Sequence, residues 1–149
     1  MFNLHPPMVH FVIALTISGT LFEILHFVTK REIFSNASLL NFLLAVPFGW
    51  GAWFTGHQQE EIVRDFIKNT YASSLLETHE TVGLIVALLV TVLTILKLIS
   101  YGRNIKALNL AVIVVSLITS AIIVYQGNIG GKMVYLYGVG VKPVMEGQR

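Results

Sequence analysis

The stretch Leu4–Phe11, LHPPMVHF, opens the first of four long apolar segments in this chain. Proline is tolerated in the first turn of a helix, because the N–H that it lacks would have no helical partner there. Pro6 and Pro7 therefore predict a helix that begins near Pro7. His5 then lies just outside this helix and His10 just inside it, so that both imidazoles lie near its N-terminus.

Apolar segments of this kind recur along the chain. A helix needs about 20 apolar residues to cross the hydrocarbon layer of a membrane, and the sequence offers such spans at residues 7–29, 36–56, 79–100 and 107–126. The chain is 54% hydrophobic and 12% charged, whereas a soluble domain is about 25% charged. We therefore expect an all-α fold, an integral membrane bundle of four helices that run up and down. Residues 1–149 would form one transmembrane domain, with an extended or irregular tail over residues 127–149.

The connection between the second and third spans is the most polar part of the chain. Ile62, Val63, Phe66 and Ile67 recur there at helical spacing among charged residues. This pattern is typical of an amphipathic helix on a membrane surface. We expect a separate surface helix here, packed over the face where the histidines collect.

Composition also excludes several kinds of function. The chain contains no cysteine, which excludes disulfides, cysteine-ligated zinc, iron–sulfur clusters and covalently attached haem. The formal net charge is +2 and the basic residues lie at the ends of spans, which gives no sign of nucleic-acid binding. The lipid bilayer is the partner that the composition indicates.

Basic residues in short loops predict the orientation in the membrane. The connections after the first and third spans hold Lys30, Arg31, Lys97, Arg103 and Lys106, and the other side holds an equal number of basic residues. Charges in short loops weigh most in the positive-inside rule. We therefore expect both termini and the histidine face outside, on the periplasmic side if the cell is a Gram-negative bacterium.

Four histidines converge on this face if the spans alternate in direction. His5 and His10 lie at the start of the first span, His57 follows the second, and His79 begins the third. Polar groups at membrane depth are candidates for function, and neutral imidazole is a good ligand for iron, copper and zinc. We expect one or two b-type haems, with His10 and His79 as the first axial pair and His5 and His57 as the second. The chain would then transfer electrons.

Small residues in the second span favour the same interpretation. Gly49, Gly51 and Gly56 leave room for a flat ligand or for a neighbouring helix. Pro47 should kink this span or loosen one of its turns.

The sequence leaves other functions open. The histidines can be simple hydrogen-bonded helix ends in a cofactor-free membrane subunit that anchors or assembles a larger complex. Alternatively, the chain binds a bare copper, zinc or non-haem iron ion, with Glu60, Glu61 or Glu80 as extra ligands, or conducts protons or ions. The third and fourth spans lack a polar line through the bundle centre, which argues against transport. Since no nucleophile elbow or Ser–His–Asp arrangement is visible, an electron-transfer or binding subunit is favoured over a stand-alone enzyme.

Glu23 and His26 lie three residues apart near the far end of the first span. A single pair of this kind is not a di-iron signature, which needs two such motifs and further glutamates. We interpret it as a polar pair near the lipid headgroups, with a proton relay or a contact to a quinone head as the functional alternative.

Two motifs bracket nearly the whole chain. His5–Leu15 is HPPMVHFVIAL and Gly130–Val141 is GGKMVYLYGVGV. They resemble the HPxxVHFxIAL and GGxxVYxxGVGV motifs of an uncharacterised bacterial membrane family, DUF2231. The resemblance implies four transmembrane helices in a bacterial inner membrane. Some relatives look fused to cytochrome-c-like modules, which implies electron transfer with a periplasmic c-type cytochrome or another membrane redox subunit. The family often carries a histidine near the paired glycines or before GVGV, where this chain has Asn128 and Tyr137, and this counts against a ligand from the closing motif.

Overall fold

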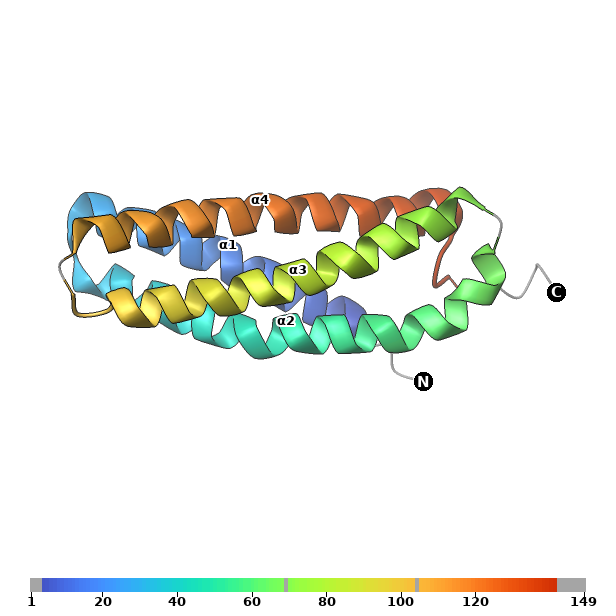
Figure 1. Cartoon of the computed structure of the whole chain (residues 1–149), viewed down its shortest axis with the longest axis horizontal. Helices are drawn as coiled ribbons and strands as arrows, with labels where there is room; N and C mark the ends of the chain where they lie inside the picture. The colour runs from blue at the N-terminus through green and yellow to red at the C-terminus, as the bar shows by residue number, and fades with distance from the viewer. Residues whose placement is uncertain (1–3, 69, 104, 142–149) are drawn as a thin grey trace.

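Four helices make up the fold of this chain. The structure is a computed structural model that describes residues 4–68, 70–103 and 105–141. Its helices are α1 (His5–Thr29), α2 (Glu32–Ile67), α3 (Tyr71–Ser100) and α4 (Lys106–Tyr137). Each helix packs against two neighbours in the order α1, α2, α3, α4 and back to α1, so that α1 and α3 face each other across the bundle diagonal (Figure 1).

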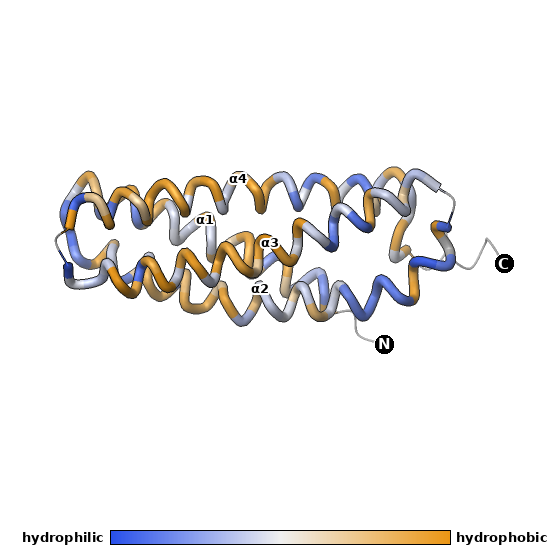
Figure 2. The backbone as a smooth tube through the Cα atoms, in the orientation of Figure 1, coloured by the Kyte–Doolittle hydropathy of each residue, from blue (hydrophilic) through white to orange (hydrophobic). Residues whose placement is uncertain are grey.

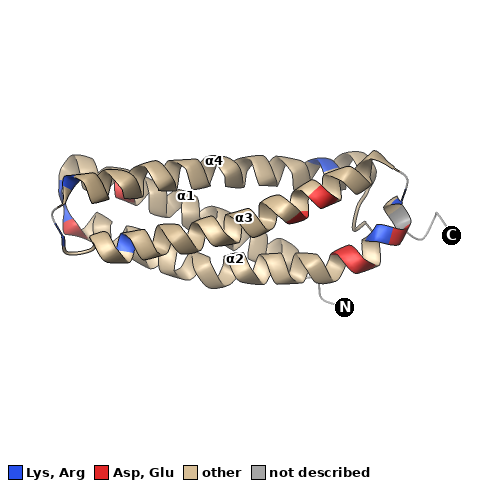
Figure 3. Cartoon of the chain, in the orientation of Figure 1, with Lys and Arg blue, Asp and Glu red and all other residues tan. Residues whose placement is uncertain are grey.

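All four helices are long and apolar enough to cross a membrane. No strand occurs among the described residues. Orange, hydrophobic backbone fills the middle of the bundle in Figure 2, and charged residues gather mainly towards its two ends in Figure 3. The expected all-α bundle of four membrane helices is confirmed.

All four helices are longer than the sequence predicted, α1 by two residues and the other three by more. The helix α2 has 36 residues, α3 has 30 and α4 has 32, against 25 in α1. At a rise of 1.5 Å per residue, α2 is about 54 Å long, which exceeds the hydrocarbon layer of about 30 Å. The short connections at residues 30–31 and 101–105 align the helices at one end. At the other end α2, α3 and α4 therefore extend past the start of α1 (Figure 1), and we call residues 57–67, 71–78 and 127–137 the three-helix projection.

The three-helix projection corrects two expectations. Residues 58–67 are helical and amphipathic as predicted, but they continue α2 without a break and do not form a separate helix on the membrane surface. No glycine or proline follows Gly56 before the end of α2, so nothing in the sequence interrupts the helix. The supposedly irregular tail is helical as far as Tyr137, and Gly138 ends α4 with a φ of 65°, a conformation that glycine adopts readily. The rest of the tail, residues 142–149, lies outside the described part.

The helices α1 and α3 also begin earlier than the expected spans. The helix α1 begins at His5, two residues before the expected start, and α3 begins at Tyr71 and not at residue 79. The helix α2 stays helical through Pro47.

The core consists of three successive clusters along the bundle axis. The cluster in the three-helix projection contains Val63, Ile67, Ala72, Leu76, Ile129 and Met133. The middle cluster contains Val12, Ala45, Val86, Val90 and Ile123, and the cluster near the short loops contains Phe42, Leu93 and Val112. The projection thus has an apolar core of its own, in which α1 takes no part.

Interhelical hydrogen bonds add to this packing. In lipid, helices associate through close packing and hydrogen bonds, because lipid tails are as apolar as the side chains. Ser18 Oγ donates to Asn41 Oδ1 at 2.7 Å between α1 and α2, and the hydroxyls of Thr20 and Ser120 lie 3.0 Å apart between α1 and α4. These bonds hold α1 against both of its neighbours.

Candidate functional site

Two imidazoles face each other across the bundle diagonal, just below the three-helix projection. His5 is the first residue of α1, and His79 lies in the third turn of α3. Their ring centroids are 6.3 Å apart and their planes make an angle of 79°. The Nδ1–H of His5 donates to the carbonyl oxygen of Ala52 in α2 at 2.9 Å. In neutral imidazole this leaves the lone pair on Nε2.

Each imidazole lies against a glycine on one of the other two helices. A Cβ atom on Gly56 of α2 would lie 2.8 Å from Cε1 of His5, and a Cβ atom on Gly130 of α4 would lie 3.1 Å from Cε1 of His79. Any other residue at Gly56 would therefore displace the His5 ring. All four helices contribute to this arrangement, and the two motifs that bracket the sequence meet here through His5 and Gly130.

Polar atoms around His79 lack partners. Its Nδ1 is buried and has no hydrogen-bond partner among the described residues, and the same holds for Oε1 of Gln126. The Nε2–H of Gln126 donates to the backbone oxygen of His79 at 2.7 Å, which joins α4 to α3. A buried polar atom without a partner is unusual and costs about 1–3 kcal/mol. Both atoms are therefore available to a ligand or a water molecule.

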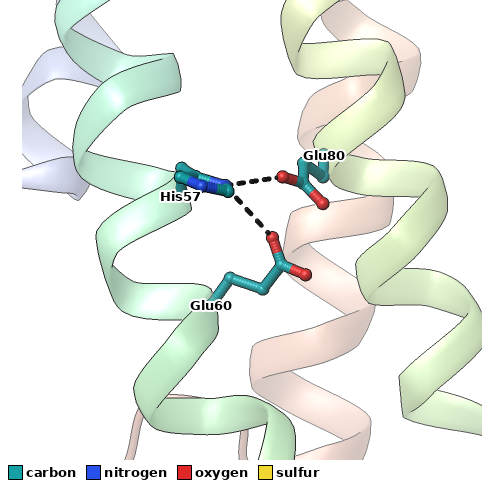
Figure 4. A group of neighbouring side chains, drawn as sticks. All are labelled: His57, Glu60 and Glu80. Carbon is teal, nitrogen blue, oxygen red and sulfur yellow. Dashed lines mark hydrogen bonds and ion pairs between the residues drawn. The ribbon is translucent and has the colours of Figure 1, made fainter.

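His57 belongs to a different cluster at the base of the three-helix projection. Its Nδ1 lies 2.7 Å from Oε1 of Glu80 and 3.7 Å from Oε2 of Glu60 (Figure 4). Its ring stacks on Trp53 with centroids 6.0 Å apart and an angle of 11° between the planes. One nitrogen or oxygen atom from each of His57, Glu60 and Glu80 lies within 4.8 Å of the other two, which is close enough to hold a metal ion.

His10 lies apart from both groups. It is exposed, and its Nδ1–H donates to the carbonyl oxygen of Pro6 in its own helix at 2.6 Å. Five helical residues turn the axis by about 140° net, so His10 points away when His5 faces the bundle interior. The pair that the structure forms is His5 with His79. The two expected pairs, His10 with His79 and His5 with His57, are not formed. The difference arises because the side of α1 that faces the bundle interior carries His5 and not His10.

Of the three glycines expected to leave room for a ligand, one lies beside the histidine pair and two pack elsewhere. Gly56 lies beside His5, whereas Gly49 packs against Val12 and Ala87, and Gly51 packs against Met8. Sequence reasoning did not assign Gly130 to the site. Its place in the closing motif was the available signal.

The far end of the bundle holds a buried ion pair. Nζ of Lys97 in α3 lies 2.6 Å from Oε2 of Glu23 in α1. Ser38 donates to the same carboxylate oxygen at 2.7 Å, and Lys97 donates to Ser35 at 3.1 Å. This group of side chains links α1, α2 and α3 inside the core.

This ion pair corrects two further expectations. Glu23 pairs with Lys97 and not with His26, whose Nδ1–H donates to the carbonyl oxygen of Arg31 at 3.1 Å. Lys97 is 2% exposed and lies within α3. It therefore does not count among the basic loop residues that predict the orientation in the membrane. The available signal was a single lysine in an otherwise apolar run, because such a charge needs a partner.

Comparisons with known proteins agree with the membrane architecture. The model of a family described as "Predicted membrane protein (DUF2231)" matches residues 1–143. The match includes the His5–His79 pair, both glycines beside it and the cluster around His57. No curated protein and no solved structure matches the chain.

Proposed function

The chain belongs to the DUF2231 family of predicted membrane proteins, and in this membrane setting we propose that it is a b-type cytochrome-like protein that binds haem between His5 and His79 and transfers electrons. One observation carries the proposal: two half-buried imidazoles from diagonal helices face each other with centroids 6.3 Å apart. A histidine nitrogen binds a metal ion at about 2.0–2.1 Å, so two rings on opposite sides of one ion have centroids about 6 Å apart. The two separations agree.

The surroundings of both rings fit this role. The hydrogen bond from His5 to Ala52 fixes the ring and directs the lone pair to Nε2, as outer-shell partners of metal-binding histidines do. Gly56 and Gly130 allow both rings to lie close to the neighbouring helices. Haem bound here would supply one-electron chemistry, and the protein would set its ligands and its exposure to water. One such pair accounts for one haem.

We further propose that this end of the bundle faces the periplasm from a bacterial inner membrane. The short connections at the opposite end carry Lys30, Arg31 and Arg103, with Lys106 at the start of α4, and short basic loops favour the cytoplasmic side. A periplasmic c-type cytochrome or another membrane redox subunit would then exchange electrons with the haem end.

A visible absorption spectrum tests the proposal. We expect the full chain, purified in detergent from cells supplied with haem, to show a Soret band and a sharp α band on reduction. His5→Ala and His79→Ala should each abolish or strongly change both bands, whereas His10→Ala is the matched control from the same helix and should retain them. Wild-type protein without a Soret band would overturn the proposal, and so would His5→Ala and His79→Ala variants with unchanged spectra.

A second candidate function is a membrane subunit that anchors or assembles a larger complex. It is favoured by large side chains exposed on the three-helix projection, where Tyr135 is 88% exposed and Tyr71 and Leu136 are each 69% exposed. This function predicts that replacement of His5, His10, His57 and His79 together leaves assembly with the partner intact. Loss of assembly in that variant, with its fold retained, would contradict it.

A further inference from the structure

We propose that His57, Glu60 and Glu80 form a metal site of their own, separate from the His5–His79 pair, which binds a divalent transition-metal ion of the Zn²⁺ class. His57 and Glu60 lie three residues apart on α2 and Glu80 lies on α3. The site would therefore join two neighbouring helices where the three-helix projection begins.

The distances suit such an ion. Nitrogen and oxygen ligands lie about 2.0–2.2 Å from Zn²⁺, so two ligand atoms of a tetrahedral site are about 3.4 Å apart. The distances from Nδ1 of His57 to the two carboxylates, 2.7 and 3.7 Å, lie on either side of this value. Figure 4 shows both carboxylates turned towards the same edge of the imidazole ring. Small side-chain movements would be enough for all three atoms to reach one ion.

The state of Glu60 is a second and independent observation. Its side chain is 5% exposed, and its Oε1 is paired with Arg64. Its Oε2 has no hydrogen bond within the described part of the chain, and Nδ1 of His57 lies 3.7 Å from it. Burial of a carboxylate oxygen without a hydrogen bond is unfavourable. A cation between this oxygen and His57 would supply the missing partner.

The charges and the exposure also favour a cation. Glu60 and Glu80 carry two negative charges, and Arg64, which is paired with Glu60 and lies 4.0 Å from Glu77, compensates only part of them. His57 is 51% exposed and Glu80 is 31% exposed, so an ion and its water ligands can enter from solvent. The ion would replace the proton that Nδ1 of His57 shares with Glu80, because metal ligands bind in their deprotonated form. The stacked ring of Trp53 already holds the imidazole in place.

Zn²⁺ binding to the purified full chain tests the proposal. After treatment with a chelator, we expect the chain to bind one Zn²⁺ by titration calorimetry, and Co²⁺ in its place to give the visible absorption of a four- or five-coordinate site. Glu60→Gln and His57→Ala should each weaken binding by about tenfold or more. Glu61→Gln is the matched control, because Glu61 is the exposed neighbour of Glu60 on the same helix, and its affinity should equal that of the wild type.

Two further measurements separate this site from others. His5→Ala and His79→Ala should bind Zn²⁺ with the affinity of the wild type. A failure of the haem proposal can therefore be distinguished from a failure of the zinc proposal. Zn²⁺ should also raise the Tm of the wild type and of Glu61→Gln, which gives a readout if Glu60→Gln folds poorly. A wild type that binds no Zn²⁺, or a folded Glu60→Gln variant that binds Zn²⁺ as tightly as the wild type, would overturn the proposal and leave a simple ion pair between His57 and Glu80.

Discussion

Glu23 of α1 and Lys97 of α3 pair at 2.6 Å across the bundle diagonal, and each side chain is only 2% exposed. The same two helices bring His5 and His79 together at the other end. An equal spacing of 18 residues separates His5 from Glu23 and His79 from Lys97. At 1.5 Å per residue this spacing is about 27 Å, close to the thickness of the hydrocarbon layer. A hydrocarbon layer centred between the two polar pairs would therefore have one pair near each of its edges.

Removal of one member of the buried ion pair should strongly destabilise the bundle. We expect Glu23→Gln or Lys97→Met to lower the free energy of unfolding by about 3–5 kcal/mol, because each leaves an uncompensated buried charge. The double variant should recover a large part of this loss. Thermal unfolding in detergent measures the effect, with Glu32→Gln, which alters an exposed carboxylate, as the control. A double variant less stable than both single variants would contradict the expectation.

A methyl group at Gly56 should disturb His5. Gly56→Ala places its Cβ 2.8 Å from Cε1 of His5, so we expect a loss of stability of about 1–3 kcal/mol from overpacking and a lower content of bound haem. Gly131→Ala is the matched control, because its Cβ would meet no atom within 4 Å. Haem content per chain and Tm measure the two effects. Equal behaviour of the two alanine variants would argue against close contact between Gly56 and His5.

The bond from Gln126 to the backbone of His79 should stabilise the contact between α4 and α3. Gln126→Ala removes this hydrogen bond of 2.7 Å, and we expect it to lower the free energy of unfolding by about 1 kcal/mol. Gln58→Ala, at an exposed position of α2, should have little effect. Unfolding of both variants in the same detergent provides the comparison, and an equal stability of the two would show that the bond is dispensable.

The continuous course of α2 has a direct test. Because the chain has no cysteine, single cysteines can be introduced and spin-labelled one at a time. We expect labels at residues 58, 62 and 65 to be accessible to a water-soluble relaxation agent and a label at residue 63 to be protected, since only Val63 among these is buried. A helix lying on the membrane would instead place residue 62 in lipid, where oxygen would relax it more strongly than the water-soluble agent.

The number and order of the helices could be predicted because hydropathy and the Pro6–Pro7 start are local properties of the sequence. The length of α2 could not, because Ile62 and Val63 give the same amphipathic pattern whether the helix lies on the membrane or leaves it. The pairing of the histidines could not be predicted either, because it depends on how the helices pack. Each residue turns the helix by about 100°, so the rotation of α1 about its own axis, which its packing against α2 and α4 sets, decides which ring faces the bundle interior.

The partner of Glu23 needed information that lies far away in the sequence. Lys97 is 74 residues further on, and its position at the end of a span made it look like an ordinary loop lysine. Only the packing of α1 and α3 across the diagonal shows that its ammonium group lies inside the core.

The equal spacing along α1 and α3 has a mechanical consequence. Both helices run in the same direction (Figure 1). They contact each other through His5 and His79 near one end and through Glu23 and Lys97 near the other. If α1 slid along α3, even by the 1.5 Å of one residue, the Glu23–Lys97 pair would be strained and His5 would shift relative to His79 at the same time. Sliding of α1 along α3 would therefore have to disturb both contacts together, because neither can adjust without the other.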